Sequence, residues 1–278
     1  METTALPRTL RAQWRVGALL AWLLPPAVAW LAAGWGVRLS WRWVAAAWLG
    51  EAYVAWRVRQ WLPGNRRGAG PVFADLGWGN AASWLRGALL ALVAATGLTG
   101  EGLHGRGLAL VAGLYACAAG LDFVDGWLAR RTGRVTRLGQ RLDLHLDGWG
   151  VFWAAWNAVR SGQMPTWFLA VGLARPAYVL WEAALRAAGR EPGPWPPSPL
   201  RRWLAGVMMV FLVAVLAPWP GPQPTRWVGV PLSALFLAHF GLDMAFVALR
   251  SGKAAVRQAA RPSADEKPGR PRAADRRG

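Results

Sequence analysis

The feature that most constrains this chain is a series of long apolar runs, each close to the length of a helix that crosses a bilayer. About 20 apolar residues in an α-helix span roughly 30 Å of hydrocarbon. Seven runs approach that length, at residues 16–36, 83–99, 107–129, 142–160, 165–186, 203–218 and 227–249. A weaker run at 42–57 carries Glu51 near its middle and is either a span or an interfacial helix. The pattern predicts an all-α fold, a polytopic transmembrane helix bundle.

The basic residues lie between these apolar runs and favour one side of the membrane. The chain has 32 Lys and Arg against 14 Asp and Glu, a net charge of +18. A nucleic-acid-binding protein would distribute such charge over a soluble fold, so we expect no nucleic-acid partner. By the positive-inside rule the basic loops and the C-terminal tail face the cytoplasm. We therefore expect a multi-pass protein of the cell membrane, with membrane lipids as partners.

Composition divides the chain into three predicted parts. A stretch at 58–82 contains several Pro and Gly residues and reads as a linker. Residues 1–70 would then be an N-terminal membrane extension, and residues 71–250 would hold the remaining spans. Residues 251–278 are rich in Arg, Lys, Pro, Asp and Glu, and are predicted to form a disordered basic cytoplasmic tail.

Four aspartates fall close together in the chain and are the first candidates for chemistry: Asp122, Asp125, Asp143 and Asp147. On helices, the i,i+3 and i,i+4 spacings project each pair from one face. A loop at 131–138 would let the two helices fold back antiparallel, so four carboxylates converge near the cytoplasmic end of both. Their charges would repel unless divalent cations neutralised them, and oxygen-only ligands favour Mg²⁺, Mn²⁺ or Ca²⁺ over Zn²⁺. The alternative is that the aspartates only pair with arginines across helices.

Small and basic residues beside the aspartates favour a nucleotide diphosphate as ligand. Gly126, Ala129 and Gly139 leave room for a ligand to approach the backbone. Arg130 is placed to pair with a phosphate.

The stretch that holds the four aspartates matches D-x2-D-G-x2-A-R-x8-G-x3-D-x3-D at every fixed position. It therefore resembles the CDP-alcohol phosphotransferases, or CDP-alcohol phosphatidyltransferases, of class I. Upstream, Asn80-Ala-Ala-Ser83-Trp-Leu-Arg86 is similar to that family's N-x2-T-x2-R, with Ser83 in place of Thr. The resemblance covers about residues 72–250 and implies a six-helix core. One or two extra N-terminal helices would precede it.

The resemblance implies a transferase that moves a phosphatidyl (phosphoalcohol) group from a CDP-alcohol to an alcohol acceptor in phospholipid biosynthesis, with release of CMP. It implies that the four aspartates hold two Mg²⁺ or Mn²⁺ ions against the diphosphate, and that Asp147 is also the catalytic base. Nucleotide-pocket positions would be Gly126, Ala129, Arg130 and Gly139, with Thr136 a further candidate in the loop. A homodimer is also implied.

The expected donor is CDP-diacylglycerol or another CDP-alcohol. Leu-Ala-Arg-Arg and Thr-Arg-Leu-Gly-Gln, within 128–140, resemble the glycerophosphate and cardiolipin synthase branches, which favours glycerol 3-phosphate as acceptor. Those branches usually place Lys or Arg directly after the fourth aspartate, whereas this chain has Gly148, so inositol phosphate or another polyol stays open. A non-enzymatic cation-binding transporter or scaffold is the alternative from another class, but corresponding interrupted helices, which a transporter should show, are not evident.

Other polar residues in the apolar runs have open roles. Arg175 has Tyr178 and Glu182 on the same face of its predicted helix, and would either bind the acceptor or form an ion pair with another helix. His239 and Asp243, at i,i+4, are expected to be mutual hydrogen-bond partners, with polar lining of the same cavity as the alternative. His145 is expected to point away from the aspartates on its helix.

Overall fold

The computed structural model describes residues 6–193, 198–219 and 221–259. This part of the chain is an all-α bundle, as the apolar runs predict. Its helices are α1 (Arg8–Gly34), α2 (Trp41–Trp61), α3 (Trp78–Thr99), α4 (Gly105–Arg131), α5 (Arg137–Arg160), α6 (Leu169–Ala187), α7 (Pro199–Leu216) and α8 (Pro222–Ala259). Short 3-10 turns precede α6 and follow α2. The described chain therefore has two helices before the six of the expected core.

Six helices of the described chain are long and apolar enough to cross a membrane: α1, α3, α4, α6 with its preceding turn, α7 and α8. This makes the protein a membrane-embedded bundle. Helix α2, the doubtful span, is not among the six, and neither is α5, which was expected to span at 142–160. Helix α5 is long enough, but it carries two aspartates, His145 and Asn157 within that stretch. Its polar side chains must find partners inside the bundle, which is where the candidate site lies.

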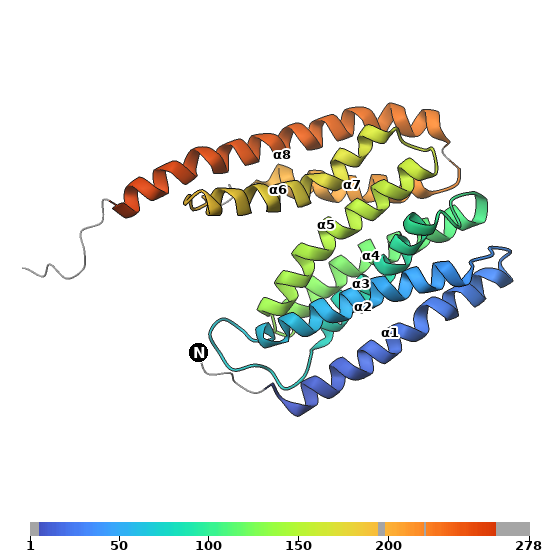
Figure 1. The fold of residues 1–278 in the computed structure, drawn as a ribbon, viewed down its shortest axis with the longest axis horizontal. Coiled ribbons are helices and arrows are strands. Elements are labelled where there is room, and N and C mark those ends of the chain that lie inside the picture. The colour runs from blue at the N-terminus through green and yellow to red at the C-terminus, as the bar shows by residue number, and fades with distance from the viewer. Residues whose placement is uncertain (1–5, 194–197, 220, 260–278) are drawn as a thin grey trace, which may run out of the picture.

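Helix α3 lies at the centre of the bundle and is the most buried of the six candidate spans. It packs against α2, α4 and α5. Small residues allow these close approaches: a Cβ on Gly87 would lie 2.7 Å from Val54 of α2, and one on Gly150 of α5 would lie 3.1 Å from Leu90. Figure 1 shows α1 along one edge of the molecule and α8 along the opposite edge, with α5 crossing between the α1–α4 group and the α6–α8 group.

The two N-terminal helices share the hydrophobic core of the other six. Leu10 of α1 and Val58 of α2 belong to the same buried cluster as Leu142 and Leu146 of α5. The indole nitrogen of Trp14 also donates to the backbone oxygen of Ala55 at 2.9 Å, which ties α1 to α2. Residues 1–70, predicted as an extension, are thus packed into the bundle as far as they are described.

Helix α8 extends beyond the expected end of the core. It continues to Ala259, past residue 251, where the tail was predicted to begin. The rest of the predicted tail, residues 260–278, lies outside the described residues.

Candidate active site

A tight turn between α4 and α5 brings the predicted aspartates together. Helix α4 ends at Arg131 and α5 begins at Arg137, so the predicted loop is present. Gly133 in this turn has φ +65°, a left-handed conformation that favours glycine. Thr136 then caps α5, because its hydroxyl accepts a hydrogen bond from the backbone N–H of Gly139 at 3.0 Å.

Three aspartates converge beyond this turn. Carboxylate oxygens of Asp122 in α4 and of Asp143 and Asp147 in α5 all lie within 4.8 Å of one another. Arg86 of α3 sits among them and is only 3% exposed. Its Nη1 donates to Asp122 and, at 3.3 Å, to Asp143, while its Nη2 donates to Asp147. The guanidinium therefore supplies positive charge where divalent cations were expected to supply it.

The fourth aspartate, Asp125, is not part of this three-aspartate group in the described chain. It is buried, and its Oδ2 accepts a hydrogen bond from the Ser83 hydroxyl at 2.7 Å. Ser83 stands where the resembling motif usually has threonine, and its hydroxyl is the donor of this contact. Ser83 and Arg86, three residues apart on α3, thus bind aspartates on two other helices.

The predicted nucleotide-binding residues divide into two groups. Gly126 and Arg130 lie together: a Cβ on Gly126 would be 3.1 Å from the Arg130 guanidinium, which is itself exposed. Ala129 instead packs against α3, where a Cβ on Gly79 would be 3.2 Å from the Ala129 methyl. An exposed arginine beside a glycine leaves room for a phosphate, so the first group suits a nucleotide better.

Thr136 and Gly139 contact the start of α3 through Asn80. The Thr136 hydroxyl donates to Asn80 Oδ1 at 3.1 Å, and a Cβ on Gly139 would lie 2.8 Å from the same oxygen. Asn80 in turn donates to Asn65 Oδ1 at 2.9 Å. In this structure both residues hold helices together, and their contact with a nucleotide stays a prediction.

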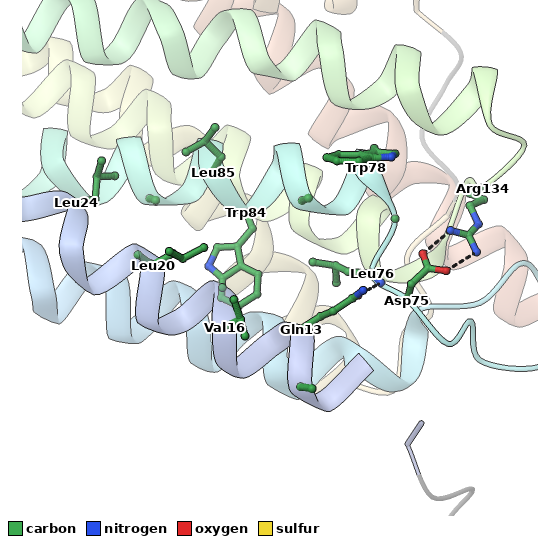
Figure 2. A pocket seen from close by; sticks show the side chains of 16 residues that line it. Gln13, Val16, Leu20, Leu24, Asp75, Leu76, Trp78, Trp84, Leu85 and Arg134 are labelled. Carbon is green, nitrogen blue, oxygen red and sulfur yellow. Dashed lines mark hydrogen bonds and ion pairs between the residues drawn. The ribbon is translucent and has the colours of Figure 1, made fainter. Parts of the chain in front are cut away.

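The linker before α3 is fixed by a surface ion pair. Asp75 pairs with Arg134 of the α4–α5 turn, with one contact at 3.0 Å. The hydrogen bond from Arg134 holds the pKa of the Asp75 carboxyl below its usual value. This pair closes one end of an apolar cavity of about 890 Å³ between α1 and α3, shown in Figure 2 with Leu20 and Trp84 in its walls. None of the four predicted aspartates lines that cavity, so we do not assign the chemistry to it.

A second cavity, of about 520 Å³, reaches Asp147. Three arginines line it: Arg175 of α6 and Arg201 and Arg202 of α7. Arg175 packs directly on α5, because a Cβ on Gly148 would lie 2.7 Å from its Cγ. The basic residue expected directly after the fourth aspartate is thus missing from the sequence, but α6 brings an arginine to the same place.

The remaining polar residues make contacts that sequence spacing did not reveal. His239 Nε2 and Asp243 Oδ2 are 3.9 Å apart, too far for the expected mutual hydrogen bond. His239 instead lies 3.2 Å from the Ser198 hydroxyl, and Asp243 accepts from Arg201 at 3.1 Å. The expected mutual hydrogen bond is therefore not formed, although the two side chains lie within ion-pair distance.

Arg175 and His145 also have defined surroundings. Within the described chain Arg175 has no carboxylate inside 4.0 Å, so the predicted interhelical ion pair is not formed there. Its guanidinium lies 5.5 Å from the centroid of the Tyr178 ring. His145 Nε2 lies 2.8 Å from the Tyr53 hydroxyl of α2, which directs it away from the aspartates as expected.

A family model described as CDP-alcohol phosphatidyltransferase matches residues 78–240. The matched range begins at the first residue of α3 and ends within α8, so it includes every aspartate and arginine of the site and leaves out α1 and α2. No curated protein and no solved structure matches the chain.

Proposed function

The chain belongs to the CDP-alcohol phosphatidyltransferase family, and on this premise we propose that it transfers the phosphatidyl group of CDP-diacylglycerol to glycerol 3-phosphate. Membership makes it a membrane transferase of phospholipid biosynthesis that uses a CDP-alcohol and an alcohol acceptor. The identity of both substrates and the role of each residue are our proposal.

The observation that carries the proposal is the position of Asp147. This residue belongs to the three-aspartate group and also lines the cavity with the three arginines. A carboxylate between a phosphoryl-binding group and an acceptor cavity is suitably placed to take the proton of the acceptor hydroxyl. The acceptor oxygen then bonds to the phosphatidyl phosphorus, the bond from that phosphorus to the bridging diphosphate oxygen breaks, and CMP leaves with the electron pair.

The aspartates also suit divalent metal. They offer only oxygen atoms as ligands. Three of them pair with one buried cation, Arg86, so three negative charges are matched by a single positive charge. We propose that Asp122, Asp125, Asp143 and Asp147 hold two Mg²⁺ or Mn²⁺ ions, and that Arg86 then releases at least one carboxylate. When bound, such ions would polarise the phosphoryl group and neutralise the leaving CMP. Arg130, exposed beside Gly126, would contact the diphosphate.

The acceptor cavity favours a phosphate-bearing alcohol over an unphosphorylated polyol. Arg175, Arg201 and Arg202 place three guanidiniums in one cavity of about 520 Å³, against the carboxylates of Asp147 and Glu182. Arginine binds phosphate in a bidentate manner, and a neutral polyol would offer no anion to Arg175, which has no carboxylate within 4.0 Å in the described chain. Glycerol 3-phosphate meets this requirement, and inositol phosphate is the alternative to be tested against it.

Orientation and assembly remain part of the proposal. We propose that the α4–α5 turn, the aspartates and the C-terminal tail face the cytoplasm, because basic residues concentrate near the ends of the helices on that side. A homodimer stays a prediction from family resemblance.

The test is CMP release from CDP-diacylglycerol by the purified full-length chain. We expect release that requires Mg²⁺ or Mn²⁺ and is fastest with glycerol 3-phosphate among glycerol 3-phosphate, inositol phosphate, inositol and serine. Faster turnover with another acceptor would replace the proposed one and leave the transferase assignment intact. Undiminished release in excess EDTA would overturn the metal assignment, and no release with any acceptor would favour a non-enzymatic cation-binding scaffold.

A further inference from the structure

A third cavity, of about 760 Å³, lies between α2, α5 and α6. It adjoins the acceptor cavity, because Leu144, Gly148 and Arg175 line both. Part of its wall, Arg57 and Trp61 of α2, comes from outside the region that the family model matches. Helix α2 therefore completes a cavity that residues 78–240 would leave open.

One end of this cavity is basic. Arg57 lies in the last turns of α2 and Arg141 in the first turns of α5, and these helix ends meet where a Cβ on Gly64 would be 3.2 Å from the backbone nitrogen of Leu138. Arg175 lies further along, at the wall shared with the acceptor cavity. No lining residue of this cavity is Asp or Glu, so its own walls leave the arginines unneutralised.

Aromatic rings hold one of these arginines in place. The Arg57 guanidinium lies 5.0 Å from the centroid of the Trp61 ring and 5.5 Å from that of Tyr53, within cation–π range. Its Nη1 also donates to Gln60 Oε1 at 3.1 Å. Such contacts fix the side chain without cancelling its charge, so it is already ordered for an anion.

The other side of the cavity is apolar and faces outward. Leu173, Pro176 and Leu180 line it at helical spacing on one face of α6, which is apolar enough to cross a membrane. Leu173 is 46% exposed and Leu180 is 71% exposed. In a bilayer this face meets hydrocarbon, whereas the ends of α2 and α5 carry the positive charge.

From this charge and shape we infer that the α2–α5–α6 cavity binds an anionic glycerophospholipid of the surrounding bilayer. Its phosphate lies at Arg57 and Arg141, and one acyl chain follows α6 along Leu173 and Leu180. A positive end beside an apolar side matches an anionic amphiphile better than it matches a soluble ligand. The proposal does not rest on the transferase reaction, since lipid binding can be measured without turnover.

The test compares lipid binding to the purified, delipidated full-length chain by native mass spectrometry. The probes are dioleoyl phosphatidylglycerol, which is anionic, and dioleoyl phosphatidylcholine, which has the same chains and no net charge. We expect phosphatidylglycerol to bind more tightly by about tenfold or more, since both headgroups offer a phosphate to the arginines but the quaternary ammonium of phosphatidylcholine would be repelled by them. Equal binding of the two lipids would overturn the proposal.

Two matched pairs of variants locate the site. Arg141→Gln should remove most of the preference for phosphatidylglycerol, whereas Arg67→Gln, at an exposed arginine outside the cavity, should keep it. Leu180→Trp should weaken the binding of both lipids, because the larger side chain would fill the side of the cavity proposed to hold the acyl chain. Leu242→Trp, on α8 and 68% exposed, should weaken neither.

The remaining outcomes also decide the question. Equal losses in Arg141→Gln and Arg67→Gln would mean that the preference is a general surface-charge effect, and equal losses in the two tryptophan variants would mean that no chain lies along α6. Competition by millimolar glycerol 3-phosphate that stays equally strong in Arg175→Gln, where the wall shared with the acceptor cavity is altered, would instead assign the basic end to a soluble phosphate. Each of these results would overturn the proposal. Thermal melting of every variant verifies that it is folded.

Discussion

Substitution of Asp147 by Asn separates the proposed role of this residue as catalytic base from its proposed role as metal ligand. The change keeps the size of the side chain and one oxygen that can accept from Arg86, but it removes basicity. A positioned general base is usually worth ~10²–10⁴ in turnover. At about 1.36 kcal/mol per factor of ten, this corresponds to a rise of about 3–5 kcal/mol in the barrier.

The same substitution should disturb binding much less. Arg86 keeps its contacts with Asp122 and Asp143, so it does not become an unpaired buried charge. The loss is one charge-assisted hydrogen bond from Arg86 that becomes neutral, worth about 1 kcal/mol, while the Asn oxygen remains available to a metal ion. Affinity for the CDP donor should therefore fall by no more than about tenfold.

Asp125→Asn is the informative comparison. Asp125 is buried and positioned by Ser83, and lies away from the acceptor cavity. As a proposed ligand it should contribute charge to the metal site, so its loss should weaken metal-dependent binding of the donor itself. Asp75→Asn, at an exposed carboxylate that pairs with Arg134, serves as the control and should leave both quantities within a few-fold of the parent.

Two measurements decide between these roles: donor affinity at saturating Mg²⁺ and single-turnover CMP release. If Asp147→Asn loses donor binding as severely as Asp125→Asn, then Asp147 is primarily a ligand. If Asp147→Asn keeps its rate within tenfold, the base must be another group.

Three further predictions address packing, burial and orientation. Gly148→Ala should raise KM for the acceptor about tenfold with little change in donor affinity, because the new methyl would lie 2.7 Å from Arg175 Cγ; an unchanged KM would refute this packing. Glu51→Gln should keep or raise Tm at neutral pH, since Glu51 is fully buried and neither carboxylate oxygen has a partner in the described chain. A clear drop in Tm would instead reveal a partner for the carboxylate. Thr132→Cys in a Cys117→Ser background should react with an impermeant thiol reagent only after cells are opened, and labelling of intact cells would contradict a cytoplasmic turn.

The sequence predicted those features that depend on neighbours within one or two helices. The aspartate spacings, for example, depend only on helical periodicity and on a short turn, and the structure has α4, the turn and α5 where they were expected. Ser83 and Arg86 were singled out only through family resemblance. Nothing local in their segment indicates that they bind aspartates 36 to 61 residues further along the chain.

The failures have the same physical cause. His239 and Asp243 have the spacing of a mutual pair, but Ser198, the N-cap of α7, and Arg201 in α7 compete for them and form the shorter contacts. The position of Arg175 beside Asp147 also depends on another helix, because Gly148 of α5 has no side chain that would exclude it. Contacts between helices determine the partners of these residues, and spacing along a single sequence does not reveal how the helices pack.

The burial of Arg86 has a consequence for how the protein is made. Ribosomes synthesise α3 before α4 and α5, so the guanidinium emerges 36 residues ahead of its first carboxylate partner and 61 ahead of its last. An arginine within an isolated transmembrane helix is disfavoured by about 2.5–3.5 kcal/mol on insertion scales. We therefore expect α3 to settle in the membrane only once the later helices have left the translocon. A nascent chain that ends before Asp147 should be a substrate for membrane quality control.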